Sequence, residues 1–144
     1  MTLSELTTDE CLRLLRTKAL GRIGFTTAAG PRVFPVNYRL HADAIVFRTL
    51  PYGVIANNAH GAQVAFEVDD VDEELRSGWS VLAVGRCKRI EDPAAVRVVR
   101  EDGDPSPWAE GTRTLYFQLE WDDLTGRQVG ETVRPTSSTA HAAQ

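Results

Sequence analysis

The run RVFPVNYRLHADAIVFRT (residues 32–49) decides the fold of this chain. Apolar and polar side chains alternate through 32–39, a tight-turn signal follows at 41–43, and 44–49 is apolar enough to be buried on both faces. Pro35 cannot donate a hydrogen bond to a ladder, so it marks a bulge, a sheet edge, or a stretch whose partner is not a strand, such as a ligand. The run therefore predicts two antiparallel strands, one of which is interrupted.

Alternating segments recur on both sides of this run. Further strands are expected at 22–27, 63–69, 78–90 and 114–121. Gly85 lies inside one of them and indicates a bend or a bulge. Six strands at meander spacing with a few short helices predict a mainly β fold, a six-stranded antiparallel barrel that is closed or nearly closed.

Three short helices have recognisable start signals. Thr7 and Glu10 form a capping box, after which apolar residues recur at helical spacing until Gly21, where we expect the helix to end. A second helix is expected at 54–59, after a Pro-Tyr-Gly break. The Asp-Pro pair at 92–93 opens a third, with the aspartate as cap and the proline in the first helical position.

The composition is that of one ordinary globular domain. The chain has 144 residues, of which 42% are hydrophobic and 25% charged, and this suffices for a core. We expect the domain to span 1–130 and the polar segment 131–144 to be a disordered tail. The net charge of −4 disfavours nucleic acid as a partner. No apolar run approaches the ~20 residues of a membrane helix, so we expect a cytoplasmic protein without a membrane partner.

The side chains of the protein include no familiar catalytic set. Cys11 and Cys87 lack the spacing of a metal or redox site, and we expect both to be reduced packing residues. The histidines at 41, 60 and 141 do not cluster, so we expect no metal site. The motifs of serine hydrolases, zinc proteases and nucleotide-binding loops are absent from the sequence. Any catalytic residues stay unidentified at this level.

The end of the strand expected at 44–49 has the chemistry of a phosphate site. Arg48 offers a bidentate cation and Thr49 a hydroxyl, and the helix expected at 54–59 would bring its first amides close to both. On spacing alone, an arginine at a strand end is also typical of a surface charge. A bound phosphate-bearing cofactor is therefore one of two interpretations of this strand end.

Four motifs together make the chain resemble a known family. They are Phe47-Arg48-Thr49-x-x-x-Gly53, VAFEVD (64–69), GWSV (78–81) and PWAxGxR (107–113). As a set they are similar to the motifs of the pyridoxamine 5′-phosphate oxidase-like flavin proteins, which are split β-barrels. The resemblance extends from about residue 7 to residue 130, most of the chain.

The resemblance implies a homodimer with two flavin mononucleotide (FMN) sites in the groove between subunits. The isoalloxazine ring would lie along 35–38 and the phosphate at Arg48 and Thr49, which gives the proline in that strand a reason. By the same analogy, Trp79, Trp108 and Arg113 would approach the flavin, some of them from the partner subunit, although such tryptophans are also typical packing residues. The complete expected cofactor-binding set is Pro35, Val36, Asn37, Tyr38, Arg48, Thr49, Gly53, Val54, Asn57, Trp79, Trp108 and Arg113.

One departure from the family pattern bears on the phosphate. Many members have a lysine one or two residues after the glycine, as a second cation, whereas this chain has Val54 and Ile55. The phosphate would then rest on one arginine, hydroxyls, backbone amides and Asn57. A missing charge-assisted hydrogen bond costs about 1.5–3 kcal/mol, a ten- to over a hundredfold loss of affinity. We therefore expect weak FMN binding or a different cofactor, and we expect Arg48→Ala to abolish FMN binding.

The function that the resemblance implies is that of a flavin-dependent oxidoreductase, which transfers hydride between a small molecule or nicotinamide donor and bound FMN. A deazaflavin cosubstrate is an alternative, and Arg22, Arg32 and Arg39 would then face its acidic tail. Haem is another, with His41 or His60 as the axial ligand. A non-catalytic flavin-binding protein is the third, and the absent lysine favours it. Family membership and activity are separate questions in such folds.

Overall fold

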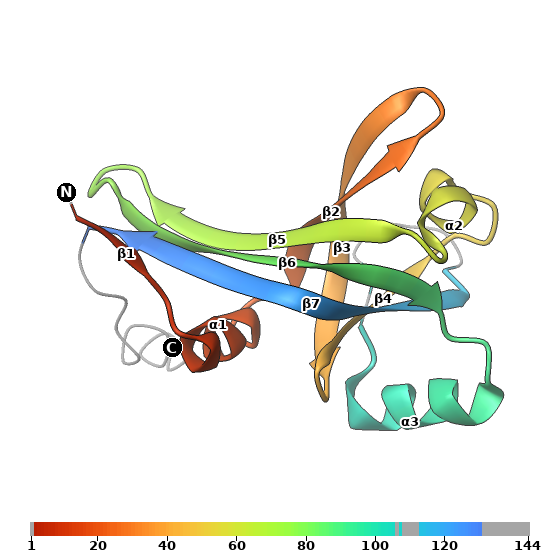
Figure 1. Ribbon diagram of the computed structural model, residues 1–144. Helices are drawn as coiled ribbons and strands as arrows, with labels where there is room; N and C mark the ends of the chain where they lie inside the picture. The colour runs from red at the N-terminus through yellow and green to blue at the C-terminus, as the bar shows by residue number, and fades with distance from the viewer. Residues whose placement is uncertain (1, 106, 108–112, 131–144) are drawn as a thin grey trace.

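The computed structural model describes residues 2–105, 107 and 113–130. The tail expected at 131–144 and Trp108 lie outside the described residues. The fold is mainly β, as the alternation predicts (Figure 1). In chain order the elements are β1 (Leu3–Glu5), α1 (Thr8–Leu15), β2 (Leu20–Thr27), β3 (Gly30–His41), β4 (Ala44–Thr49), α2 (Val54–Ala59), β5 (Gln63–Asp72), β6 (Ser77–Arg89), α3 (Pro93–Gly103) and β7 (Leu115–Val129).

The strands form one antiparallel sheet that closes into a barrel. The strand order is β1-β7-β4-β3-β2-β5-β6, and an additional pairing of β6 with β7 joins the two sides. β6 pairs with β7 along almost its whole length, from Gly78↔Val129 to Arg89↔Phe117. The six predicted strands therefore make the barrel, and the short β1 adds to the outer edge of β7.

The barrel is open between β3 and β4. The N-terminal part of β3 pairs with β2, yet the ladder of β3 with β4 begins only at Tyr38↔Phe47. β4 continues its pairing with β7 beyond that point. The next residues on the two strands, Asn37 and Arg48, therefore lie on either side of an opening.

Pro35 lies on the edge of β3 that faces this opening. The amide of Tyr38 donates to the carbonyl of Ala19 at 3.0 Å. Because main-chain groups in a strand point alternately to the two sides, the amide of Val36 also faces β2, whereas the nitrogen of Pro35 faces the opening. Proline costs no ladder hydrogen bond at this position, and of the three alternatives that the sequence left open the structure shows a sheet edge.

The barrel interior is packed with aromatic and small apolar side chains. The ring of Phe66 meets that of Tyr38 edge-on, with centroids 5.2 Å apart, and stacks on Phe47 at 6.4 Å. All three side chains are at most 1% exposed. Cys11 and Cys87 are free and fully buried, as predicted. The core is therefore continuous from α1 to the strands around the opening.

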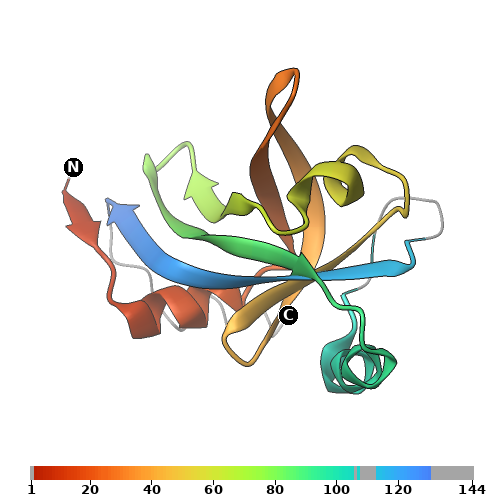
Figure 2. The ribbon, with the colours of Figure 1, turned by 45° about the vertical axis from the view of Figure 1, so that its right-hand side comes forward.

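Helices α2 and α3 lie on opposite sides of β4 and β7 at one end of the barrel (Figure 2). α2 sends Ile55 and Ala59 into the main core. α3 packs Val99 against Val46 and Tyr116 in a second, smaller cluster on the outer face. Both helices begin where the sequence predicted, and together they cover the end of the barrel that contains the opening.

Helix α1 is shorter than the sequence predicted. Its capping box is present, because the Thr7 hydroxyl accepts from the Glu10 amide (3.2 Å) and the Glu10 carboxylate accepts from the Thr7 amide (2.8 Å). The expectation that the helix reaches Gly21 is wrong, since it ends at Leu15. The Tyr38 hydroxyl donates to the Leu15 carbonyl at 2.5 Å. The Leu15 carbonyl, which would accept a main-chain hydrogen bond if the helix continued, thus accepts a tertiary hydrogen bond instead.

The last strand is longer than predicted, and one strand was not predicted. β7 continues to Val129 because β6 pairs with it there and β1 pairs with its other edge. These pairings are non-local, so the local alternation of side chains does not predict them. The irregularity expected at Gly85 is confirmed by a register shift between Val84 and Gly85, where a Cβ would overlap the Glu120 carbonyl oxygen. No helix in the described ranges is long and apolar enough to cross a membrane.

Candidate functional site

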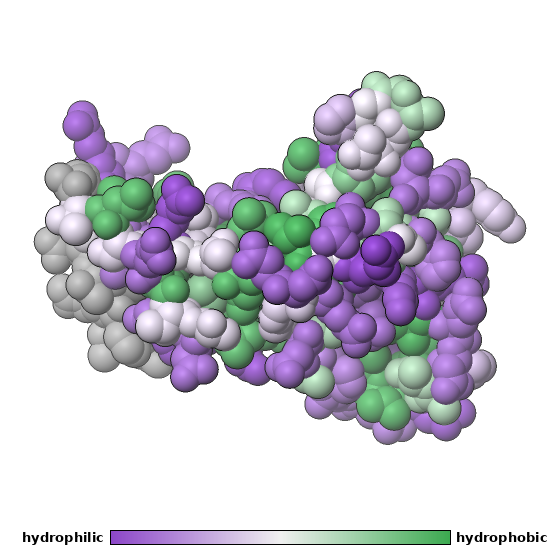
Figure 3. Space-filling model, viewed as in Figure 1, coloured by the Kyte–Doolittle hydropathy of each residue, from purple (hydrophilic) through white to green (hydrophobic). Residues whose placement is uncertain are grey.

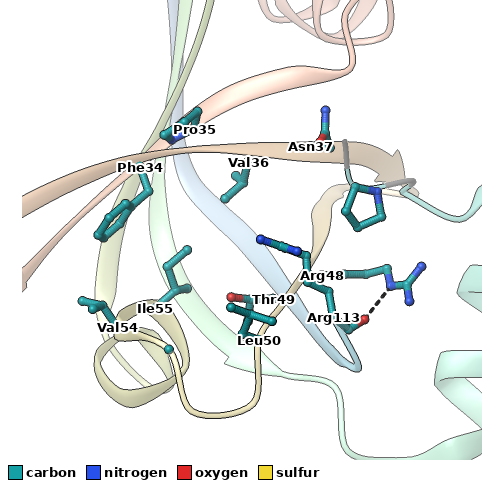
Figure 4. A pocket seen from close by; sticks show the side chains of 12 residues that line it. Phe34, Pro35, Val36, Asn37, Arg48, Thr49, Leu50, Val54, Ile55 and Arg113 are labelled. Atoms are coloured by element: carbon teal, nitrogen blue, oxygen red, sulfur yellow. Dashed lines mark hydrogen bonds between the residues drawn. The ribbon is translucent and has the colours of Figure 1, made fainter. Parts of the chain in front are cut away.

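A cavity of about 210 Å³ lies where β3 and β4 separate. Its walls come from the middle of β3, the end of β4, the start of α2, and two residues that precede β7 (Figure 4). The sequence predicted a phosphate-binding strand end at this place. The lining residues are Phe34, Pro35, Val36, Asn37, Arg48, Thr49, Leu50, Gly53, Val54, Ile55, Pro107 and Arg113.

Strand β3 borders the cavity in two ways. The side chains of Phe34 and Val36 point into the cavity, whereas those of Pro35 and Asn37 project from the opposite face of the strand (Figure 4). The Asn37 amide nitrogen donates to the Ala19 carbonyl at 3.2 Å. Pro35 and Asn37 therefore border the cavity through their main chain, and a flat ligand against this strand would meet apolar side chains on one face.

Thr49 supplies the hydroxyl predicted at the end of β4. It is a buried polar residue, 6% exposed, and its hydroxyl is turned toward the cavity (Figure 4). Beyond it, Gly53 is the N-cap of α2 and makes no side-chain capping bond. Because α2 has only six residues, its dipole is small, and the polar chemistry of the cavity rests mainly on side chains.

The two arginines of the cavity point in opposite directions (Figure 4). Arg48 extends away from the centre of the cavity. Its Nε donates to the Arg113 carbonyl at 3.0 Å, and its Nη1 pairs with Asp104 at 2.8 Å. Arg113 extends its guanidinium toward Thr49 and Val36. The cation that faces the cavity is therefore Arg113, whereas the sequence pattern assigned that position to Arg48.

Arg48 belongs to a partly buried polar network under α3. The hydroxyl of Tyr116 donates to Asp104 at 2.6 Å and accepts from Arg100 at 2.9 Å. The guanidinium groups of Arg48 and Arg100 lie 5.1 and 5.4 Å from the centre of the Tyr116 ring. Burial, and then the bond to Asp104, raise the pKa of Tyr116, so the phenol keeps its proton and remains a donor. The network fixes where Arg48 points.

Gly103 places Asp104 in this network. Helix α3 ends at Gly103, whose φ of +144° is a conformation that L side chains rarely adopt. A Cβ on Gly103 would lie 2.6 Å from a guanidinium nitrogen of Arg39. The flexible Arg39 side chain could move aside, so it is the backbone turn that needs the glycine, and the turn directs the next residue toward β4.

Among the described residues, three of the predicted ones are not brought to the cavity. Tyr38 is buried in the core. Asn57 is exposed, and its amide donates to the Tyr52 carbonyl at 3.4 Å. Trp79 lines another cavity, near the tip of the β5–β6 hairpin and far from α2 (Figure 1). Trp108 lies outside the described residues. A role for Trp79 would have to come through a partner subunit.

Two groups of site residues were missed by the sequence reasoning. Phe34, Leu50 and Ile55 line the cavity, and for Phe34 the two-residue period shared with Val36 was a usable signal. Asp104 carried no local signal, because its ion pair joins residues 56 positions apart. Only the return of the chain after α3 brings Asp104 to Arg48.

A second charged cluster lies on β2 and β5. Arg22 pairs with Glu67 at 3.2 Å and with Asp69 at 3.5 Å. Burial, followed by the hydrogen bond and charge of Asp69, raises the pKa of Glu67 to about 7. None of these residues lines the cavity between β3 and β4. Arg22, which the sequence offered as a contact for a deazaflavin tail, is already held in ion pairs.

Fold and cavity together define an antiparallel split barrel with a cavity at the split. The chain belongs to the pyridoxamine 5′-phosphate oxidase family, whose model matches residues 7–128. It is 32% identical over 130 residues to Rv0080, an uncharacterized protein of Mycobacterium tuberculosis, and the match covers 87% of this chain and 84% of the relative.

Solved structures agree with this assignment. A FAD-binding protein from Mycobacterium smegmatis superposes with a TM-score of 0.76 at 27% identity, over 89% of this chain and 99% of the other. A FAD-binding protein from Mesorhizobium loti superposes with a TM-score of 0.73 at 20% identity, over 91% and 99% of the two chains. The second likeness bears on the fold alone.

Proposed function

We propose that this chain is a flavin-dependent oxidoreductase that binds its flavin in the cavity between β3 and β4. The observation that carries the proposal is the convergence of Arg113 and Thr49 on a cavity beside the open edge of β3. The FAD-binding protein of M. smegmatis, similar over most of the chain, supports a flavin as the ligand. FMN is the proposed form, because it is the smallest flavin that carries a phosphate.

The residues of the cavity fit the parts of a flavin. The guanidinium of Arg113 and the hydroxyl of Thr49 suit a phosphate, while Phe34 and Val36 offer apolar contact to a ring laid along 35–38. A bound flavin would supply the hydride chemistry. The residues of this chain then need only to bind the ligand, orient it and keep water away, so no catalytic acid or base is required.

We further propose that the chain acts as a homodimer whose groove completes the site. The cavity of about 210 Å³ is smaller than the roughly 300–1,000 Å³ of typical ligand pockets. Large apolar side chains are exposed beside it: Val33 (64%), Tyr52 (90%) and Val54 (46%). Others are exposed over the middle of β5 and β6 (Figure 3). Such surfaces are typical of an interface, and the second subunit would bring Trp79 toward the flavin.

The first test is a visible absorption spectrum of the purified protein, with mass identification of any released chromophore. We expect a flavin spectrum, or its appearance when FMN is titrated into protein at micromolar concentration. Anaerobic addition of NADH or NADPH should then bleach the flavin band. Absence of binding by FMN, FAD and riboflavin would refute the proposal, and binding without reduction by any donor would favour the non-catalytic alternative.

A matched pair of arginine variants tests where the flavin binds. Arg113→Gln removes the cavity cation and should weaken FMN binding by about ten- to a hundredfold, the effect of one charge-assisted hydrogen bond. Arg16→Gln removes an exposed arginine at the end of α1, which lines neither this cavity nor the one beside Trp79, and should leave the FMN affinity unchanged. Equal losses in both variants, with unchanged melting temperatures, would contradict the placement of the phosphate.

Haem is the less supported alternative. The Nδ1 of His41 lies 2.7 Å from a carboxylate oxygen of Asp102, and the Nδ1 of His60 accepts from the Arg89 amide at 3.0 Å. Neither histidine lines the cavity. A Soret band in the spectrum of the purified protein would nevertheless establish haem. A deazaflavin would be recognised by its own shorter-wavelength absorption.

A further inference from the structure

A second cavity, of about 410 Å³, lies on the outer face of the barrel between α3, the end of β6 and the start of β7. Figure 1 shows α3 below these strand ends. The cavity shares no lining residue with the one between β3 and β4. Its volume is within the roughly 300–1,000 Å³ of typical ligand pockets. The lining residues are Arg89, Ile90, Glu91, Pro93, Val96, Arg97, Arg100, Thr114, Leu115 and Tyr116.

The charge of this lining is opposite in sign to that of the whole chain. Three arginines and one glutamate give the lining a formal charge of +2, whereas the chain carries −4. Arg89 is the last residue of β6, and Arg97 and Arg100 lie three positions apart on α3, a spacing that puts both on one face of the helix. The fold thus brings arginines from two elements to one cavity.

The three guanidinium groups differ in how they are held. The Nε of Arg100 donates at 2.9 Å to the hydroxyl of Tyr116, a side chain that is only 2% exposed, so a buried group fixes one cation at the wall. Among the described residues, the side chains of Arg89 and Arg97 make neither an ion pair nor a hydrogen bond. Their donors are therefore available to an anion that enters the cavity.

Part of the lining is apolar and fixed. Ile90 and Val96 pack against the small core cluster that includes Tyr116, so their positions are set by the fold. Leu115 at the start of β7 adds to this wall. A few charged groups beside an apolar wall are typical of a site for a small organic anion.

We propose that this cavity is a second ligand site, which binds a small phosphate monoester with a compact apolar part. A phosphate monoester carries about −1.5 to −2 at pH 7, which balances the lining charge of +2, whereas a sulfate ester carries only −1. Guanidinium groups also bind phosphate oxygens in bidentate pairs. The site is independent of the proposed flavin site, because the two cavities have no lining residue in common.

The test is isothermal titration calorimetry of the full-length protein with phenyl phosphate, phenyl sulfate, phenol and inorganic phosphate. We expect one phenyl phosphate per chain. Phenyl sulfate should bind about tenfold more weakly because it has less charge, and inorganic phosphate about tenfold more weakly because it lacks the ring. Absence of binding by phenyl phosphate would refute the site, and equal affinities for the phosphate and sulfate esters would refute its ligand class.

Arginine variants locate the bound anion. Arg97→Gln should weaken phenyl phosphate binding about tenfold. Arg16→Gln makes the same charge change at the end of α1, where the residue is exposed and outside this cavity, and should leave the affinity unchanged. Arg113→Gln should also leave it unchanged. A loss in Arg113→Gln but not in Arg97→Gln would place the phosphate in the other cavity and overturn the proposal.

A glutamate variant tests the charge of the lining by a gain of affinity, which a misfolded variant would not show. Glu91→Gln raises the formal charge of the lining to +3 and should tighten phenyl phosphate binding about threefold. Glu101→Gln is the matched control, since Glu101 is an exposed α3 residue outside the lining. Unchanged or weaker binding in Glu91→Gln would overturn the role of this charge. No flavin enters the experiment, so its failure would leave the flavin proposal standing.

Discussion

The two sides of the barrel are built differently. On the side of β5, β6 and β7, ladders run without interruption except for the bulge at Gly85, and β5 pairs with β6 from Gln63↔Arg86 to Asp72↔Ser77. On the side of β3 and β4, the ladder stops at Tyr38↔Phe47. The closed side is stabilised by continuous strand pairing. The open side lacks part of its strand pairing, and this leaves a strand edge that a ligand could contact. Variants on the two sides should therefore differ in how much they change the stability of the fold.

The largest effect is expected in the core of the closed side. Phe66→Ala removes a ring that contacts Tyr38 and Phe47 and should lower the free energy of unfolding by about 3–5 kcal/mol. Leu82→Ala on the neighbouring strand is the control, because Leu82 is 39% exposed. Urea unfolding measures both. A loss at Phe66 no greater than that at Leu82 would contradict the assignment of stability to this core.

A proline exchange compares the two edges of β3 directly. Val36→Pro removes an amide that faces β2 and should cost about 2–3 kcal/mol of unfolding free energy. Pro35→Ala changes a nitrogen that faces the opening and should cost less than about 1 kcal/mol. Thermal unfolding of the two variants ranks them. The opposite order would mean that the open edge is the one with the ladder.

The network under α3 should contribute a moderate amount. Tyr116→Phe removes the hydroxyl that bonds Asp104 and Arg100 and should destabilise the fold by about 1–2 kcal/mol. Tyr52→Phe makes the same chemical change on a side chain that is 90% exposed and should have no measurable effect. Indistinguishable melting temperatures for the two would remove the network as a support of the open side.

The smallest effect depends on pH and concerns the outer face of the closed side. The pKa of Glu67 is raised to about 7 in the folded state, so the folded chain binds more protons than the unfolded chain between pH 4.5 and about 7. Stability from this group is present at low pH and falls as pH rises through that window. Glu67→Gln should therefore be more stable than the wild type above pH 7, by about 1 kcal/mol after solvent screening.

The control for this prediction is Glu73→Gln, a change in the exposed hairpin turn. It should leave the pH profile of the melting temperature as it is in the wild type. At low pH, where Glu67 is protonated in both states, the Glu67→Gln variant and the wild type should converge. A constant difference at all pH values would mean that the carboxyl does not titrate in this window.

Much of the fold was predictable because its signals are local. Alternation located the six barrel strands, the capping box at Thr7 located a helix start, and the glycine at 85 located a bulge. The end of α1 was not predictable in this way, because Tyr38, 23 residues along the chain, supplies the bond at Leu15. The length of β7 was missed for a similar reason, since its far half depends on β6 and β1.

The candidate site divides along the same line. The sequence by itself determined where it lies, because Pro35 lacks the amide that a ladder needs and the strand ending in Arg48 and Thr49 carries polar groups that line the cavity. Only the tertiary structure decided which arginine faces the cavity. That choice depends on Asp104, which α3 and the turn at Gly103 bring against Arg48. The sequence gives the residue types directly, but the direction of a flexible charged side chain depends on the partners that folding places beside it.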